Sequence, residues 1–320
     1  CYLGGGSRES KGRVLPLMAI NPSILVSRRF VTPMNFPALR LFALCALLVS
    51  ALALNAIPPR VPALIEPATQ EYLSGKIVWA DVLSTEPNTT ARFYSALFGW
   101  SSRTLAGESG KYTVLSNEAG PVVGIARGPD RKDGRAVARW VPFFSHRTLH
   151  AAELAVASEG GKVLAETAPF PTRGSQLIAM DAEGAIFGLM DSSTGDPADG
   201  TVIDGSLFWA NLFVESPADA ARFYRLVAGL NASSNGSSSQ LLAASGENRA
   251  SISPIEGKTS VTPTWVPFFR VSGMDRKLRI AQRLGAKLVV QPQTMGNGMR
   301  VAILSDTLGG VFALAQPKAG

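Results

Sequence analysis

The feature that most constrains the fold of this chain is an internal repeat. Residues 76–94 (KIVWADVLSTEPNTTARFY) align with residues 206–224 (SLFWANLFVESPADAARFY) at a constant offset of 130 positions. After a shorter middle section the offset becomes 125, and the segment WVPFF at 140–144 recurs at 265–269. A repeat of this length indicates a duplicated folding unit, and the 320 residues also exceed the ~100 to 200 residues of one domain. The repeat therefore predicts two domains of the same fold.

The positions of the two copies divide the chain into five segments. Residues 193–204 are rich in Ser, Gly, Asp and Pro, a composition typical of an exposed linker. Residues 57–74 contain several prolines and precede the first copy. We expect a leader over 1–56, a linker over 57–74, a first domain over 75–192, a second linker over 193–204 and a second domain over 205–317.

Within each copy, strand patterns alternate with helix patterns. Ile77–Ser84 is rich in apolar and β-branched residues, which predicts a strand. Thr89–Phe98 has apolar residues at helical spacing, with Asn88 as a candidate N-cap and Gly99 as a stop. The second half of the copy repeats this order, with a strand at 140–144, a helix at 149–158 and strands at 162–166, 176–180 and 186–190. The order predicts an α+β protein of four βαβββ modules, two in each domain, whose curled sheets surround a pocket.

Four segments of the first copy are characteristic in combination. They are the opening strand with the helix motif ARFY and its end LFGW (97–100), the strand WVPFF, the turn GGK (160–162) and the segment DAEGAIFGL (181–189). With these motifs the chain resembles a two-domain, glyoxalase-like member of the glyoxalase/bleomycin-resistance/dioxygenase (vicinal oxygen chelate) superfamily. The resemblance covers both copies and implies paired βαβββ modules, but it does not imply a substrate, because one fold hosts many chemistries.

The superfamily's metal positions decide whether metal chemistry is available to this chain. Related enzymes hold a divalent metal with a His or Gln on the first strand, a His on the strand that opens the second half, and a Glu on the last strand. The resemblance places these positions at Trp79, Val141 and Gly188 in the first copy and at Trp209, Val266 and Ala313 in the second. None of these side chains is a metal ligand. We therefore expect no metal site and no cofactor, with a divalent metal held by other residues as the alternative.

The chain has only two histidines, His146 and His150, and the second copy has no counterpart to either. Four residues apart on a helix, they could share a face as in some zinc sites. The HExxH pattern is absent, however, and we interpret the two as a surface pair at the start of the second helix.

Matched polar residues follow the strand tryptophans by two positions. These pairs are Trp79 with Asp81 and Trp209 with Asn211, and a spacing of two puts both members on one strand face. If this face lines the pocket, each pair supplies an aromatic wall and one polar group for a small organic ligand. The alternative is that the tryptophans only fill the space left by the missing metal. A buried Asp81 with a raised pKa could also serve as a general base, although no catalytic partner is identified.

Other repeated aromatic residues are better explained by packing. Trp140 and Trp265 open equivalent strands, and Pro142 and Pro267 within those strands predict either a sheet edge or a domain seam. The Arg-Phe-Tyr triplets at 92–94 and 222–224 are expected to turn Phe and Tyr inward from an amphipathic helix.

The charge of the chain is concentrated in its leader. Residues 1–56 hold six basic residues and one acidic residue, so the remaining 25 basic and 23 acidic residues give +2, although the whole chain carries +7. The basic pI therefore gives no reason to expect a nucleic-acid partner. Both cysteines, Cys1 and Cys45, also lie in the leader, which leaves the folded domains without disulfides or thiolate ligands.

The leader has the pattern of an export signal. Three arginines precede the uncharged run Leu41–Leu54, and small residues follow it. The run is shorter than the ~20 residues of a membrane-spanning helix, which favours a cleaved signal peptide, cut after Ala53 or Ala56, over an N-terminal membrane anchor. Met34 is a candidate translation start.

These observations favour an exported, periplasmic or extracellular, metal-independent member of the superfamily that binds a small organic molecule, as the bleomycin-resistance type does. One alternative is a glyoxalase-like lyase, isomerase or dioxygenase that uses a divalent metal. The other is a structural or interaction protein in which Trp79 and Trp209 plug the two pockets. A membrane is expected as a partner only through an uncleaved leader.

Overall fold

The computed structural model of the chain describes residues 60–107, 110–200, 202–234, 239–255 and 262–318. The predicted leader, its signal peptide and Met34 lie outside the described residues. Within the described ranges, no helix combines the length and the apolar character that crossing a membrane requires.

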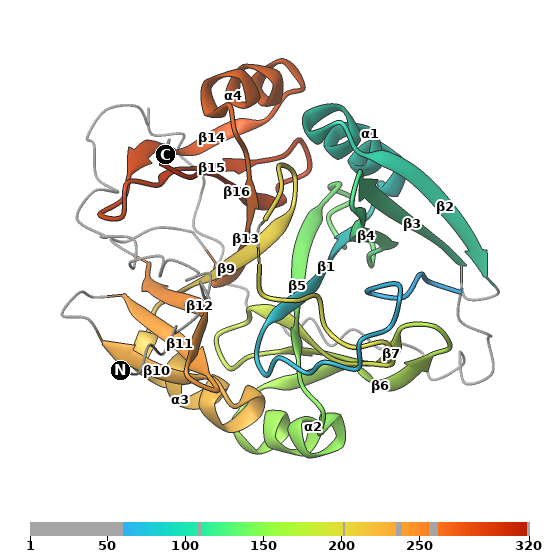
Figure 1. Ribbon diagram of the computed structural model, residues 1–320, viewed down its shortest axis with the longest axis vertical. Helices are drawn as coiled ribbons and strands as arrows, with labels where there is room; N and C mark the ends of the chain where they lie inside the picture. Colours follow the sequence, from blue (N-terminus) through green and yellow to red (C-terminus); the bar gives the residue numbers. More distant parts are fainter. Residues whose placement is uncertain (1–59, 108–109, 201, 235–238, 256–261, 319–320) are drawn as a thin grey trace, which may run out of the picture.

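The first copy forms eight strands and two helices in its described part, coloured blue to yellow-green in Figure 1. They are β1 (Ile77–Ser84), α1 (Pro87–Phe98), β2 (Ser101–Gly107), β3 (Gly110–Asn117), β4 (Gly120–Arg127), β5 (Ala138–Ser145), α2 (Leu149–Ser158), β6 (Lys162–Phe170), β7 (Gly174–Met180) and β8 (Ile186–Ser192).

The second copy repeats the same element order, in yellow to red (Figure 1). Its elements are β9 (Leu207–Val214), α3 (Pro217–Ala228), β10 (Asn231–Ser234), β11 (Gln240–Ala244), β12 (Glu247–Pro254), β13 (Thr264–Arg270), α4 (Met274–Arg283), β14 (Lys287–Thr294), β15 (Arg300–Ser305) and β16 (Val311–Gln316).

In the residues that the structure describes, each copy forms one mixed sheet of eight strands. The strand order is β2-β3-β4-β1-β5-β8-β7-β6 in the first copy and β10-β11-β12-β9-β13-β16-β15-β14 in the second. In the first sheet, β1 runs parallel to β4 and antiparallel to β5, and β5 runs parallel to β8. Each half of a sheet is thus one βαβββ module, and the prediction of four such modules in an α+β fold is confirmed.

Helix α1 begins earlier than the sequence pattern predicts. Pro87 occupies its first turn and Glu86 is the N-cap residue, so Asn88 lies inside the helix and is not its cap. Proline suits this place because its fixed φ is helical and its missing N–H would have had no partner there. The predicted stop at Gly99 is confirmed, since Gly99 adopts the left-handed conformation with φ 82° and its N–H donates to the Ser95 carbonyl.

The two domains share their hydrophobic cores. One core contains β1, α1 and β4 of the first domain with β13, α4, β15 and β16 of the second. The other contains β5, α2, β7 and β8 of the first domain with β9, α3, β11 and β12 of the second. In Figure 1, α1 accordingly lies beside α4, α2 lies beside α3, and β5 and β13 meet at the centre. We name these the α1–α4 core and the α2–α3 core.

A buried chain of hydrogen bonds crosses the domain interface in each core. In the α1–α4 core, Trp140 Nε1 donates to Tyr94 Oη (3.0 Å), and Tyr94 Oη donates to Asp306 Oδ2 of the other domain (2.8 Å). The equivalent residues of the α2–α3 core are Trp265, Tyr224 and Asp181, with distances of 2.8 and 2.9 Å. The repeated motifs ARFY, WVPFF and Asp-x-x-Gly therefore meet at the interface, which explains why both copies carry them.

The WVPFF strands lie at a domain seam. The edge alternative for Pro142 is wrong, because β5 lies in the middle of its sheet between β1 and β8. Its ladder with β8 starts at Phe143, after the proline. The seam alternative is right, since the ring of Phe144 lies 4.9 Å from that of Trp265 and the ring of Trp140 lies 5.3 Å from that of Phe269.

The segment 193–204, predicted to be an exposed linker, is bonded to both domains. Asp196 is only 1% exposed and accepts hydrogen bonds from Ser145 Oγ (2.5 Å) and the Leu73 amide (2.7 Å). Asp199 pairs with Lys76 of the first domain (2.5 Å) and with Arg249 of the second (2.8 Å). The segment is polar partly because Asp196 and Asp199 accept hydrogen bonds from the two domains, and not only because it is exposed to solvent.

Candidate functional site

The two predicted binding residues of the first domain lie on one face of β1. Trp79 and Asp81 are hydrogen-bonded to each other on the concave face of the curled sheet (Figure 1), while the alternate residues Ala80 and Val82 belong to the α1–α4 core. The predicted shared face is confirmed, and its cause is the two-residue period of a strand. Both side chains are deeply buried, Trp79 at 2% exposure and Asp81 at 6%.

Asp81 is held by two donors on the same carboxyl oxygen. Tyr112 Oη, from β3, donates to Asp81 Oδ1 at 2.6 Å, and Trp79 Nε1 donates to this oxygen at 2.8 Å. Gly124 of β4 lies opposite Asp81 in the strand register. A Cβ at position 124 would stand 1.8 Å from Tyr112 Oη and 2.3 Å from Asp81 Oδ1. Only glycine therefore leaves room for this hydrogen-bonded pair.

Arg173 completes the cluster from the turn between β6 and β7. Its guanidinium carbon lies 3.8 Å from the centroid of the Trp79 ring, a cation–π contact. Nε donates to the Pro62 carbonyl at 2.9 Å. Arg173 is 0% exposed, and its Nη1 and Nη2 have no hydrogen-bond partner among the residues that the structure describes. We call Trp79, Asp81, Tyr112 and Arg173 the domain-1 site.

An N-terminal segment closes this site. Residues 60–73, which we call the strap, place Leu64 in the same buried cluster as Trp79 and Phe143. Thr172, next to Arg173, donates to the Val61 carbonyl. The other end of the strap is fixed where the amides of residues 69 and 70 donate to the Thr194 carbonyl at 3.0 and 3.2 Å. The predicted linker over 57–74 is therefore, in its described part, a docked segment that contributes to the first domain.

The electrostatics of the domain-1 site follow from its burial. Loss of hydration raises the pKa of Asp81, and the Tyr112 hydrogen bond, the Arg173 charge and the Trp79 hydrogen bond lower it only in part. Burial also raises the pKa of Tyr112 well above its ordinary value of 10.0, so the phenol keeps its proton and acts as the donor. The site thus combines a carboxyl group that takes up a proton more readily than an exposed aspartate with a buried guanidinium.

Replacing Asp81 with Asn is expected to raise the melting temperature at neutral pH. Because the folded-state pKa is raised above 3.8, the folded chain binds the proton more tightly than the unfolded chain. Wild-type stability therefore falls as pH rises from about 3.8 through the folded-state pKa. Thermal melts should show the gain of the variant above this window and no gain below it, and a pH-independent gain would contradict the explanation. The reverse variant, Asn211→Asp in the second domain, should lose stability at neutral pH.

The second domain has a neutral version of the same arrangement. Trp209 Nε1 donates to Ser251 Oγ (3.0 Å), and Ser251 and Ser253 donate to Asn211 Oδ1 (2.5 and 3.2 Å). Ser251 lies opposite Asn211, as Gly124 lies opposite Asp81. Asn211 is 0% exposed and has hydrogen-bond partners.

The second domain also lacks a counterpart to Arg173, because the equivalent residue at the offset of 125 is Gly298. The two copies therefore differ in charge at the same place in the fold.

The superfamily's metal positions are filled by apolar packing in both domains. Phe143 lies opposite Trp79 on one side and beside Gly188 on the other, and its ring stands 2.2 Å from where a Cβ of residue 188 would be. In the second domain Phe268 has the same neighbours, Trp209 and Ala313. No cluster of three His, Cys, Asp or Glu side chains suited to a metal ion occurs in the part of the chain that the structure describes. The residues at these positions do not fit the metal of the related enzymes.

The two histidines do not form a site with each other. Helix α2 begins at Leu149, so His146 lies before the helix and cannot share a helix face with His150. His150 is exposed, whereas the His146 ring is half-buried and burial lowers its pKa. The interpretation as a shared surface pair is therefore correct only for His150.

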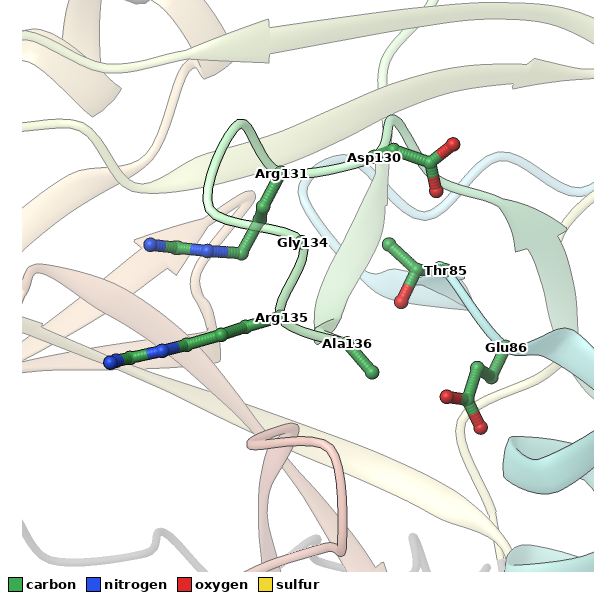
Figure 2. A pocket seen from close by; sticks show the side chains of 7 residues that line it. All are labelled: Thr85, Glu86, Asp130, Arg131, Gly134, Arg135 and Ala136. Carbon is green, nitrogen blue, oxygen red and sulfur yellow. The ribbon is translucent and has the colours of Figure 1, made fainter.

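A shallow surface pocket of about 190 Å³ lies elsewhere, between the end of β1 and the 128–137 loop. Figure 2 shows the side chains of Arg131 and Arg135 pointing away from the carboxyl groups of Asp130 and Glu86. Asp130 pairs with Arg127 and Asp133 pairs with Arg131, so charges of both signs neutralise each other locally. None of the four predicted binding residues lines this pocket.

Sequence reasoning missed Tyr112 and Arg173. Tyr112 lies on β3, in the section where the two copies differ in length, and Arg173 lies in a turn. A signal was present, because positions 81 and 173 carry charge in the first copy where the second has Asn211 and Gly298. Tyr112 and Arg173 come close to Trp79 because of the strand register and the β6–β7 hairpin, and the sequence repeat specifies neither of these.

Comparisons with known proteins agree with this architecture. No family model matches the chain. The protein CFP32 of Mycobacterium tuberculosis, which is named as a glyoxylase, is 26% identical over 262 residues, covering 78% of this chain and 98% of its own length. The anthracycline biosynthesis protein DauV of Streptomyces sp. (strain C5) is 25% identical over 260 residues, covering 77% of this chain and 94% of its own length.

Solved structures of two enzyme classes share the fold. The Mn(II)-bound glyoxalase from Novosphingobium aromaticivorans matches with a TM-score of 0.53 and 18% identity, over 78% of this chain and 83% of its own. The 2,3-dioxygenase LapB from Pseudomonas sp. KL28 matches with a TM-score of 0.52 and 13% identity, over 79% and 94%. The chain has the tandem vicinal oxygen chelate fold. The resemblance found in the repeated motifs is thereby confirmed, and it extends across both vicinal oxygen chelate domains.

Proposed function

We propose that this chain is an exported vicinal oxygen chelate protein that binds a small organic molecule in its first domain without a resident metal. The observation that carries this proposal is the buried Arg173 guanidinium, whose terminal nitrogens lack partners in the described part of the chain, beside the buried Asp81 carboxyl group. Export is supported by the sequence pattern of the leader, in which arginines precede the uncharged run 41–54.

The energetics favour a ligand over simple packing in the first domain. A buried charged group without full hydrogen bonding costs several kcal/mol, about 3 to 5 when a partner is missing. The second domain avoids this cost, because its equivalent positions are neutral and Asn211 is hydrogen-bonded to two serines. A buried charge without full hydrogen bonding breaks the usual rules of a protein interior, and such exceptions are expected at functional sites. A ligand that satisfies Arg173 explains why the first copy keeps its charges.

The names of the relatives support a small organic molecule as the ligand. One relative is named as a glyoxylase and another as an anthracycline biosynthesis protein. The metal-dependent alternative lacks ligands at the superfamily positions Trp79, Val141 and Gly188, where the ring of Phe143 packs between Trp79 and Gly188. We therefore place metal-free binding ahead of a metal-dependent lyase, isomerase or dioxygenase.

Thermal-shift screening of the chain against a small-molecule library, in EDTA and again with Mn²⁺, tests this function. At least one compound should raise the melting temperature in EDTA, by an amount that corresponds to about 2.7 kcal/mol at a hundredfold excess over Kd. Gly124→Ala should abolish the shift, because its Cβ displaces Tyr112 from Asp81. Ser251→Ala, at the equivalent position of the second domain, should keep it. Shifts that require Mn²⁺ would support the metal enzyme instead.

A structural protein with filled pockets is the second candidate, and one observation favours it. Trp79, Asp81, Trp209 and Asn211 are all at most 6% exposed, and Leu64 of the strap packs over the first pair. This candidate requires that no compound in the library shifts the melting temperature of the wild-type chain. It also requires Gly124→Ala and Ser251→Ala to affect stability alone.

A further inference from the structure

Arg173 offers two terminal nitrogens at the domain-1 site. Nε is already used by the Pro62 carbonyl, and the guanidinium face is covered by the Trp79 ring. Nη1 and Nη2 are buried and lack partners among the described residues. These two nitrogens form the planar fork that pairs with both oxygens of a carboxylate.

Asp81 is not the carboxylate that pairs with Nη1 and Nη2 of Arg173. Its Oδ1 accepts from both Tyr112 Oη and Trp79 Nε1, which directs the carboxyl group toward β3. Its negative charge acts on Arg173 through space, but no ion pair joins the two within the described ranges. The fork of Arg173 is thus left for an acidic group from outside the chain, while the nearby Asp81 moderates its positive charge.

The surroundings of the fork are apolar. The cluster on the concave face contains Leu64, Trp79, Val114, Val141, Phe143 and Met190. The body of a ligand held at Arg173 must therefore be apolar, since a polar body would lose hydration without gaining partners. Leu64 is the one member supplied by the strap, and all the others come from the sheet.

We propose that the domain-1 site binds a small carboxylic acid with an apolar body, whose carboxylate pairs with Nη1 and Nη2 of Arg173 and whose body replaces Leu64. This inference rests on the proposed function and specifies its ligand class. Strap residues 69–73 stay attached through their bonds to 194 and 196, and the carbonyls of Val61 and Pro62 stay bonded to Thr172 and Arg173, so that only the segment around Leu64 moves aside as the acid enters.

Isothermal titration of the full chain in EDTA with matched acids and amides tests this inference. The probes are phenylacetate and hexanoate, with phenylacetamide and hexanamide as neutral counterparts of the same shape. Both acids should bind, and each amide should bind at least tenfold more weakly. Leu64→Ala should bind the acids more tightly than wild type, because less apolar contact is lost when the strap moves. Equal binding of acids and amides would overturn the inference.

Variants at Arg173 test whether this residue binds the carboxylate of the ligand or only stabilises the fold. Arg173→Met should reduce acid affinity at least tenfold while leaving the melting temperature of the free protein unchanged or higher, because methionine can pack on Trp79 without a buried charge. Arg173→Lys should bind weakly, since lysine lacks the fork. Arg103→Met, which removes an exposed arginine of β2, is the matched control and should bind like wild type.

The outcomes distinguish this inference from the proposed function. Acid binding that survives in Arg173→Met, or that falls equally in Arg103→Met, would overturn the carboxylate anchor. If amides or other neutral compounds bind and only Gly124→Ala abolishes their binding, the proposed function stands and the acid specificity falls. If no probe and no library compound binds, both fall.

Discussion

Replacing Asp306 with alanine is expected to destabilise the chain by about 4 kcal/mol, because several buried donors lose one acceptor at once. Asp306 accepts from Tyr94 Oη across the domain interface at 2.8 Å. It also accepts from the amides of Leu308 and Gly310 at 2.9 and 2.8 Å, which holds the turn before β16. Urea denaturation at neutral pH, followed by circular dichroism, measures this loss as a lower transition midpoint.

Two further variants serve as controls for Asp306→Ala. Asp306→Asn keeps an acceptor for the turn amides. It also removes a carboxyl group whose pKa is raised by burial, so this variant should lose only about 1 kcal/mol of stability. Asp130→Ala removes an exposed carboxylate and should change stability by less than about 0.5 kcal/mol. The explanation fails if Asp306→Ala is no more destabilising than Asp130→Ala. By the repeat, Asp181→Ala should behave like Asp306→Ala.

Separating the chain at the second linker should abolish cooperative folding of both halves. Residues 60–204 would expose the first-domain side of both shared cores, and residues 205–318 would expose the other side. Each half would also lose the cross-domain bond of Tyr94 or Tyr224. Burial of apolar surface provides most of the stability of a domain, so neither half retains enough to fold alone.

Thermal melts of the two halves and of the intact chain measure this dependence. The intact chain should unfold in one transition, each half should show none, and an equimolar mixture should recover a transition that depends on concentration. A half that melts cooperatively as a monomer would show that the shared cores are not required.

The repeat made the fold predictable because it is carried by residues with structural duties in both copies. Tyr94 and Tyr224 from the ARFY helices and Trp140 and Trp265 from the WVPFF strands meet at the domain interface. Periodicity also placed Trp79 and Asp81 on one face, since alternation along a strand is local. What these residues contact was not predictable, because Tyr112 reaches Asp81 through the register of other strands.

Segments without periodicity were predicted least well. The 193–204 linker and the strap are polar or proline-rich, which is typical of exposed loops. Asp196 is nevertheless buried, because its carboxylate accepts from Ser145 and Leu73, and Leu64 is buried because the concave face of the first sheet has room for an apolar side chain. Arg173 was missed for the same reason, since a turn residue acquires its environment only when the hairpin folds over β1.

The first domain, and not the second, is expected to bind a small molecule at Arg173 without a metal. A crystal structure of the chain, soaked in EDTA with the compound that stabilises it most, tests this claim directly. Density for the compound should lie against Nη1 and Nη2 of Arg173, with Leu64 displaced from its place near Trp79. Density only at Asn211 in the second domain, or an unchanged strap with nothing bound beneath it, would contradict binding at Arg173.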